Sequence, residues 1–194
     1  FNLFRAVAIL NITISVVQRF FHFIADIIAL SLITVIIRYD QAAGTLSISI
    51  EDDGCGMDEA YLEKVTNPFV TGRTTRRVGL GIPLFKAGAE GCGGSFEIKS
   101  QKGRGTLVSA VFITGNIDCP PLGNMTDTMV SQVISHQNVD FIYKFITNAG
   151  EMNFDTREIK GALAGVPLDA PEIISWMRQS INEEINEIGG GKVL

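Results

Sequence analysis

The 194-residue sequence has few of the side chains that build metal centres and disulfide frameworks. Its three cysteines, Cys55, Cys92 and Cys119, form no Cys-x-x-Cys pair, and it has only two histidines. This argues against a zinc site or a disulfide-rich secreted fold and favours a reducing cytoplasm. Strong positive charge is also lacking, because the net charge is −5. We therefore expect no generic nucleic-acid-binding surface.

A long apolar run without charges is missing as well. Residues 20–37 are mostly apolar, but they include His22 and Asp26. Their length is at the lower limit for a spanning helix, and a central Asp costs roughly 3 kcal/mol on insertion scales. We favour a buried helix over residues 17–30 followed by a strand, so no membrane span is expected. A membrane helix is the less favoured alternative.

The hydrophobic pattern predicts an α+β fold: a two-layer α/β sandwich with a sheet and helices on one face. The expected strands are 32–39, 45–51, 95–99 and 106–113, and the expected helices are 58–66 and 82–90. Composition changes at residue 114, which divides the chain into domains 1–114 and 115–194. The second part is expected to be a small α/β extension with helices 125–135, 155–163 and 170–188 and a hairpin of strands 139–147 and 151–154.

The most informative motif is an acidic glycine turn directly after the predicted strand 45–51. It reads Asp52-Asp53-Gly54-Cys55-Gly56, the pattern Asp-x-Gly-x-Gly. The Asp52 carboxylate can accept a hydrogen bond from the exocyclic amino group of a purine. Gly54 and Gly56 would allow a tight turn and the close approach of a flat base. Asp53 is interpreted as a solvated neighbour. Alone the pattern is weak, because such turns close many hairpins.

Three further segments follow in order. Pro68-Phe69 precedes a stretch rich in threonine and arginine, residues 71–77, whose Thr71, Arg73 and Thr74 can bind phosphate oxygens. Gly79, Leu80 and Gly81 then open a predicted helix, where free backbone N–H groups favour an anion. The last segment is Gly103-Arg104-Gly105-Thr106. The chain contains no Walker motif.

Together, these segments resemble the GHKL nucleotide-binding superfamily: gyrase, histidine kinases, mismatch-repair ATPases and the large heat-shock chaperone. The resemblance covers residues 45–112 well, residues 1–44 poorly, and does not reach residues 115–194. It implies a Bergerat-type mixed sheet that binds ATP with Mg²⁺. By this resemblance Asp52 and Thr106 hold the adenine, Phe69 belongs to the aromatic box before a lid, and residues 70–78 are that lid.

The segment that should ligate magnesium is poorly matched. In the family an N-terminal helix carries a Mg²⁺-binding Asn, usually with a Glu as general base, but residues 1–50 contain no Glu. Asn11 is the best metal ligand by residue type, although Asp26 lies nearer the expected position. No catalytic residue is assigned. Either turnover is weak or absent, or the first 38 residues are not the natural ones.

The sequence also lacks a phosphoacceptor of the sensor-kinase type, because neither His22 nor His136 is followed by an acidic residue. The chain looks like a stand-alone histidine-kinase-type ATP-binding domain with a C-terminal extension. We expect a cytoplasmic regulatory protein whose lid closes over ATP and signals to a protein partner, with partner phosphorylation or slow hydrolysis. The alternatives are a degenerate scaffold subunit of a larger, redox-related complex and a Ser/Thr kinase like the anti-sigma-factor kinases. The oligomeric state is left open.

Overall fold

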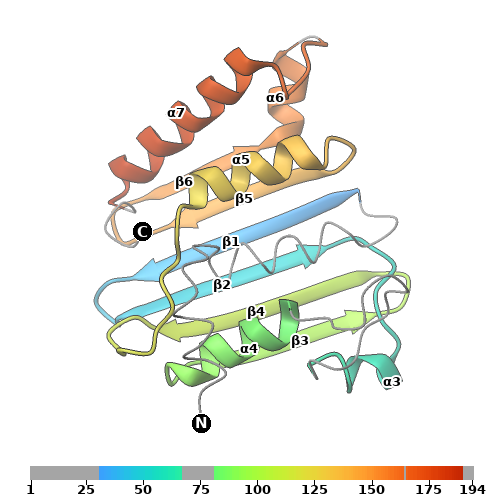
Figure 1. Ribbon diagram of the computed structural model, residues 1–194, viewed down its shortest axis with the longest axis vertical. Helices are drawn as coiled ribbons and strands as arrows, with labels where there is room; N and C mark the ends of the chain where they lie inside the picture. Colours follow the sequence, from blue (N-terminus) through green and yellow to red (C-terminus); the bar gives the residue numbers. More distant parts are fainter. Residues whose placement is uncertain (1–30, 67–80, 164, 190–194) are drawn as a thin grey trace, which may run out of the picture.

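The computed structural model describes residues 31–66, 81–163 and 165–189, and its centre is a six-stranded sheet in the order β3-β4-β2-β1-β5-β6 (Figure 1). Among the described strands, only β1 and β5 pair in parallel, and every other pair is antiparallel. The strands are β1 Leu32–Asp40, β2 Thr45–Asp52, β3 Ser95–Gln101, β4 Gly105–Ile113, β5 Asp140–Ile146 and β6 Glu151–Asp155. The sheet is therefore mixed, as predicted.

One face of this sheet is buried because apolar residues alternate along the strands. Ile33, Val35 and Ile37 of β1 are fully buried, and their register partners on β5, Phe141, Tyr143 and Phe145, continue the same face. The helices pack on this face: α4 on β3 and β4, and α5 on β5 (Figure 1). The described helices are α3 Glu59–Leu62, α4 Gly81–Gly91, α5 Met125–Ser135, α6 Thr156–Ala162 and α7 Pro171–Glu187. The two-layer α+β architecture is confirmed.

Aromatic packing fixes α4 on the sheet. Phe85 is fully buried, and its ring lies 6.3 Å from that of Phe96 and 5.6 Å from that of Phe112. Pro83 stands in the first turn of the helix, where a missing N–H has no intrahelical partner to lose. This packing holds the start of α4 at a defined place relative to the strand ends.

The C-terminal part of the chain does not build a sheet of its own. β5 pairs along β1 from Leu32↔Asp140 to Arg38↔Ile146, and β6 adds the edge strand. α7 packs against α5 and β6 (Figure 1). The strands of residues 115–194 thus extend the first sheet, and a domain division at residue 114 stays a prediction.

The expected helix 58–66 is much shorter in the structure. Asp58 caps it, as predicted, with its Oδ1 accepting from Tyr61 N–H at 2.8 Å. After Leu62 the hydrogen bonds change to the tighter i→i−3 type, from Lys64 to Tyr61 and from Val65 to Leu62.

The predicted helix 17–30 lies outside the described residues. Within the described ranges, no helix has the length and apolar character needed to cross a membrane.

Candidate functional site

The acidic turn and the glycine turn meet at one end of the sheet. β2 pairs with β4 so that Asp52 stands opposite Thr106, and β3 places Ser100 opposite the same Thr106. α4 leads through a short turn into β3 and packs on it, so the helix runs antiparallel to this strand. The start of α4 therefore lies toward the end of β2 that carries Asp52. The structure brings together Asp52, Gly54, Gly56 and Thr106, four of the residues assigned to the site from the sequence.

Asp52 is a buried carboxylate at the last position of β2, with only 5% of its surface exposed. Its Oδ1 accepts a hydrogen bond from Gly54 N–H at 2.9 Å. Burial raises the pKa of Asp52, and hydrogen bonds from the backbone of Gly54 and Thr106 offset part of this rise. A carboxylate has about four acceptor positions, so Asp52 keeps acceptor capacity beyond the bond from Gly54.

Ser100 joins the two turns, and the sequence analysis missed it. Its Oγ accepts from Met57 N–H at 2.8 Å and donates to the carbonyl of Gly105 at 2.9 Å. The Thr106 Oγ1 also lies 2.9 Å from Ser100 Oγ. The sequence signal was a polar residue at an inward position of β3, where Phe96 and Ile98 occupy the two preceding inward positions.

The glycines of the two turns allow backbone to pack against backbone. Gly56 has φ +60°, and a Cβ placed on it would lie 2.0 Å from the carbonyl oxygen of Gln101. Gly105 has φ +98°, and its Cβ would lie 1.9 Å from the carbonyl oxygen of Asp52. Only glycine fits at both positions. The sequence pattern predicts the close approach of a flat base at Gly56, whereas in the structure the backbone of Gln101 makes this approach.

Asp53 is not merely a solvated neighbour. Its carboxylate accepts hydrogen bonds from Ser31 N–H at 2.8 Å and Leu32 N–H at 2.9 Å, and from the Ser31 hydroxyl. Burial raises the pKa of Asp53, but these hydrogen bonds outweigh burial and hold the pKa below its usual value. Asp53 therefore ties the acidic turn to the start of β1.

Most of the predicted phosphate-binding residues lie outside the described ranges, namely Thr71, Arg73, Thr74, Gly79 and Leu80. The predicted aromatic-box residue Phe69 and the predicted metal ligand Asn11 also lie outside them. Gly81 is described and buried at the start of α4. Within the described ranges, no three His, Cys, Asp or Glu side chains gather into a metal-binding group.

Comparison with known proteins agrees with this geometry. Residues 17–114 match the family model described as histidine kinase-, DNA gyrase B-, and HSP90-like ATPase. The chain belongs to this ATPase family. The matched segment contains the acidic turn, α4, and the glycine turn with Thr106.

Two curated relatives of this ATPase domain are sensors by name. The chain is 33% identical over 85 residues to a protein of Shewanella frigidimarina (strain NCIMB 400) described as a sensor protein, covering 43% of the chain and 13% of that protein. It is also 33% identical over 76 residues to a protein of Bacillus subtilis (strain 168) described as a C4-dicarboxylate sensor kinase, covering 39% of the chain and 14% of that protein. The match thus spans about an eighth of each relative's length.

The described part of the ATPase domain places hydrogen-bonding groups close together at this end of the sheet. A buried acceptor, Asp52, stands beside the hydroxyl of Thr106, and the two glycine-dependent turns fix both side chains. The positive end of the α4 dipole lies on the same side. These features suit an adenine amino group at Asp52 and an anion toward α4.

Proposed function

We propose that this histidine-kinase-like ATPase domain binds ATP with its adenine held by Asp52 and Thr106. The observation that carries the proposal is the buried Asp52 carboxylate, fixed by Gly54 and placed opposite Thr106. An ionised carboxylate accepts the adenine amino group in a charge-assisted hydrogen bond, which is stronger than a neutral one. The raised pKa of Asp52 indicates that burial disfavours its ionised form, so a hydrogen bond donated by the adenine amino group would stabilise that form.

The contacts that we propose for the phosphates rest on the sequence and on the resemblance to the family. Arg73 and the hydroxyls of Thr71 and Thr74 would contact phosphate oxygens, and the N–H groups at Gly79, Leu80 and Gly81 would add the field of the helix terminus. Phe69 would anchor this segment. Mg²⁺ would neutralise phosphate charge when it is bound. Asn11 is the proposed ligand, and no general base is assigned.

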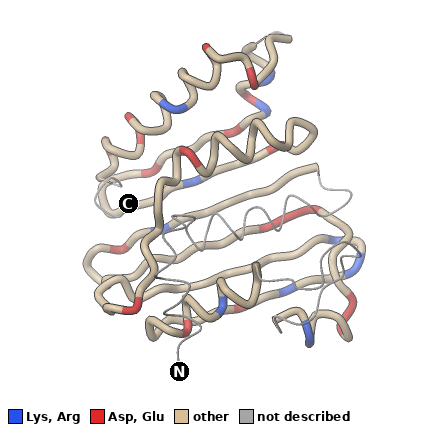
Figure 2. The backbone as a smooth tube through the Cα atoms, viewed as in Figure 1, with Lys and Arg blue, Asp and Glu red and all other residues tan. Residues whose placement is uncertain are grey.

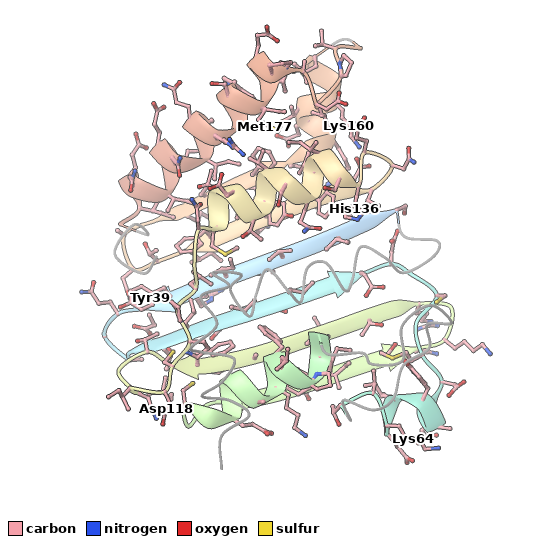
Figure 3. The ribbon with its side chains drawn as sticks, in the orientation of Figure 1. Tyr39, Lys64, Asp118, His136, Lys160 and Met177 are labelled. Atoms are coloured by element: carbon pink, nitrogen blue, oxygen red, sulfur yellow. The ribbon has the colours of Figure 1, made fainter. Side chains whose placement is uncertain are left out.

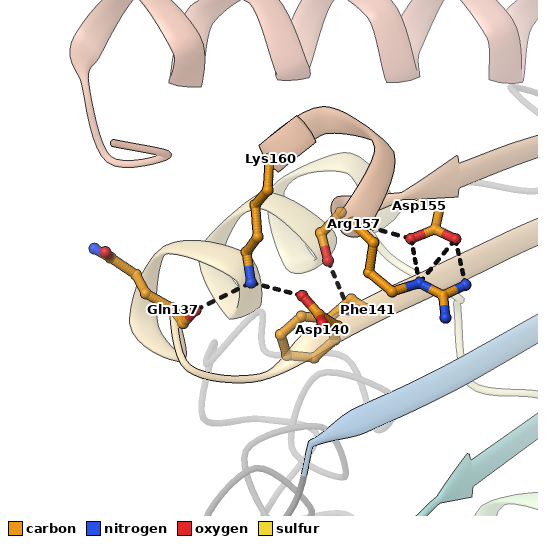
Figure 4. A network of polar contacts seen from close by, with 7 residues as sticks. Gln137, Asp140, Phe141, Asp155, Arg157 and Lys160 are labelled. Carbon is orange, nitrogen blue, oxygen red and sulfur yellow. Dashed lines mark hydrogen bonds and ion pairs between the residues drawn. The ribbon is translucent and has the colours of Figure 1, made fainter. Parts of the chain in front are cut away.

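We further propose that the nucleotide changes a surface that a protein partner recognises. A chain of hydrogen bonds leads away from the acidic turn: Asp53 binds Ser31, and Ser31 C=O accepts from Asp140 N–H at 2.8 Å. The Asp140 carboxylate accepts from Lys160 of α6 at 2.6 Å, and Lys160 also donates to the carbonyl of Gln137 (Figure 4). A shift of the acidic turn on ATP binding therefore has a connected route to α6.

The polar cluster around α6 is well suited to hold a defined position. Thr156 Oγ1 accepts from Phe141 N–H, and Asp155 forms a bidentate ion pair with Arg157 (Figure 4). The pKa of Asp155 is lowered, mainly by the hydrogen bonds from the Arg157 side chain.

Three free thiols, Cys55, Cys92 and Cys119, support our assignment of this function to a reducing cytoplasm.

The test is titration calorimetry with Mg-ATP on the wild type and on Asp52→Asn. Loss of a hydrogen bond to a charged group costs about 1.5–3 kcal/mol, so affinity should fall about 10- to 100-fold. The matched control is Glu51→Gln, which alters the adjacent residue on the opposite, exposed side of the strand and should bind as the wild type does. Equal affinity of wild type and Asp52→Asn would refute the proposal.

The same samples also test the alternative that the protein is a scaffold that keeps the fold but no longer binds nucleotide. ATP at 100 times its dissociation constant stabilises the folded state by about 2.7 kcal/mol, so a melting curve that does not move with Mg-ATP favours the scaffold. If ATP binds, transfer of labelled γ-phosphate to a co-purified protein separates a kinase from a slow ATPase.

A further inference from the structure

The outward face of α7 carries an exposed aromatic side chain. α7 buries Met177, Ile181 and Ile185 toward α5 and β6, whereas Trp176 is 50% exposed. Tryptophan buries more apolar area than any other side chain and is enriched at the energetic centres of protein interfaces. The other large apolar side chains of α7 are buried or partly buried. The half-exposed indole of Trp176 would therefore lose apolar exposed surface if a partner covered it.

The neighbours of Trp176 on the helix surface define what could cover it. Residues three and four positions apart are adjacent on a helix, which places Glu172 and Ile173 before the indole and Gln179 after it. The Gln179 side chain donates a hydrogen bond to the Glu183 carboxylate at 2.8 Å. Glu183 is therefore the next residue on this side of the helix, and its carboxylate is fixed by Gln179. We call this row, Glu172, Ile173, Trp176, Gln179 and Glu183, the α7 ridge.

The ridge and the rest of α7 carry carboxylates that form no ion pair within the described part of the chain. Among the described residues, none of the four α7 glutamates forms an ion pair, and the only arginine of α7, Arg178, is paired with Asp127 of α5 at 3.3 Å. The four glutamates are Glu172, Glu183, Glu184 and Glu187. Figure 2 shows acidic positions along this helix. The helix therefore presents negative charge beside an apolar ring.

The charge of the whole chain is divided in the same way. Residues 115–194 contain eleven acidic and five basic residues, whereas residues 1–114 contain ten acidic and eleven basic residues. All of the net negative charge thus belongs to the C-terminal part. Such a field attracts basic partners and repels nucleic acids and anionic membranes.

We propose that the α7 ridge docks a basic, arginine-rich segment of a partner protein. One guanidinium group can stack on the indole of Trp176, while other arginines of the same segment pair with Glu172 on one side of the indole and with Glu183 on the other. A two-fold dimer through this face is a poorer occupant, because it would bring the same carboxylates of two copies together. The proposal does not depend on nucleotide binding.

Trp176 is also the reporter for the test, because it is the only tryptophan of the chain. The full chain is titrated with a synthetic peptide of alternating arginine and alanine without aromatic residues, and Trp176 emission is recorded. A saturable change that weakens with added salt is expected. The lysine analogue should bind more weakly, because it lacks the planar fork, and the glutamate analogue should not bind. No saturable change with the arginine peptide would overturn the proposal.

Variants then locate the binding surface, with affinities measured from the anisotropy of a labelled arginine peptide. Trp176→Ala, and separately Glu172→Gln with Glu183→Gln, should each reduce affinity about tenfold, in line with a cation–π contact and two exposed ion pairs. The control combines Ile117→Ala and Asp118→Asn, since Ile117 is 96% exposed and Asp118 lies far from Met177 of α7 (Figure 3). Equal loss in the control and in the ridge variants would show non-specific attraction and refute the assignment to α7.

Discussion

Replacing Ser100 with alanine tests whether the two turns of the site are held by one hydroxyl. Ser100 Oγ accepts from Met57 N–H at 2.8 Å, donates to Gly105 C=O at 2.9 Å and lies 2.9 Å from Thr106 Oγ1. Each bond contributes about 1 kcal/mol net. Because Ser100 is only partly buried, water can replace part of the loss, and we expect Ser100→Ala to lower the free energy of unfolding by about 2 kcal/mol.

Urea denaturation of the two proteins measures this loss. The matched control is Ser49→Ala, another serine on the same sheet whose single contact to Ser109 is longer, at 3.3 Å. The control should cost no more than about 0.5 kcal/mol, because surface substitutions away from buried networks rarely cost more. If Ser100→Ala is no more destabilising than Ser49→Ala, the hydroxyl does not hold the turns together.

A second measurement separates positioning from stability. Inosine triphosphate lacks the amino group that Asp52 is proposed to accept, so the ratio of ATP to inosine triphosphate affinity reports on the adenine site alone. Ser100→Ala should lower the ratio of ATP affinity to inosine triphosphate affinity, because Thr106 and the acidic turn lose the hydroxyl to which both are hydrogen-bonded. An unchanged ratio together with lower stability would leave Ser100 a purely structural residue.

Two further predictions concern the same end of the sheet. Gly56→Ala should lower the free energy of unfolding by about 3 kcal/mol or more in urea denaturation, because the added Cβ would lie 2.0 Å from the carbonyl oxygen of Gln101. The control Gly103→Ala, at φ +78° but with no atom within 4 Å of the added Cβ, should lower it by only about 1–2 kcal/mol. Equal losses in the two variants would contradict the predicted steric clash at Gly56. ATP affinity should fall as pH is lowered through the raised pKa of Asp52, and calorimetry should find no such dependence on this group in Asp52→Asn.

The pKa of Asp52 has the opposite consequence for stability. A raised pKa means that the folded protein binds the proton more tightly than the unfolded chain. The contribution of Asp52 to folding is therefore greatest below its unfolded pKa and falls as pH rises through its folded pKa. Asp52→Asn should then be at least as stable as the wild type at neutral pH while binding ATP more weakly.

The strands could be predicted from the sequence because their signal is local. Alternating apolar residues mark β1, β2 and β4, and the inward positions form the core. The short α3 shows the limit of this reasoning. Tyr61, Leu62 and Val65 repeat at helical spacing, but the same spacing fits a tighter turn that buries Val65. Periodicity alone does not distinguish the two.

The site could be predicted only as far as its motifs reach. Asp52, Gly54, Gly56 and Thr106 stand in recognisable glycine patterns, whereas Ser100 acts through the register of β3 against β4. The contact of Asp53 with Ser31 spans 22 residues and depends on where β1 begins. The hydrogen-bond partners of Ser100 and Asp53 depend on how the strands pair in the folded protein, and this pairing cannot be read from the sequence motifs.

The shared sheet restricts how the signal that we propose could leave the ATPase domain. A hinge between the two parts of the chain would have to break the β1–β5 ladder, which has seven register pairs from Leu32↔Asp140 to Arg38↔Ile146. At about 1 kcal/mol for each hydrogen bond, this exceeds the 1–3 kcal/mol typical of coupling between sites. A rigid-body separation is therefore a poor model. Smaller shifts at the strand ends break fewer hydrogen bonds. There Asp53, Ser31, Asp140 and Lys160 are hydrogen-bonded in series, which connects the proposed adenine site with α6.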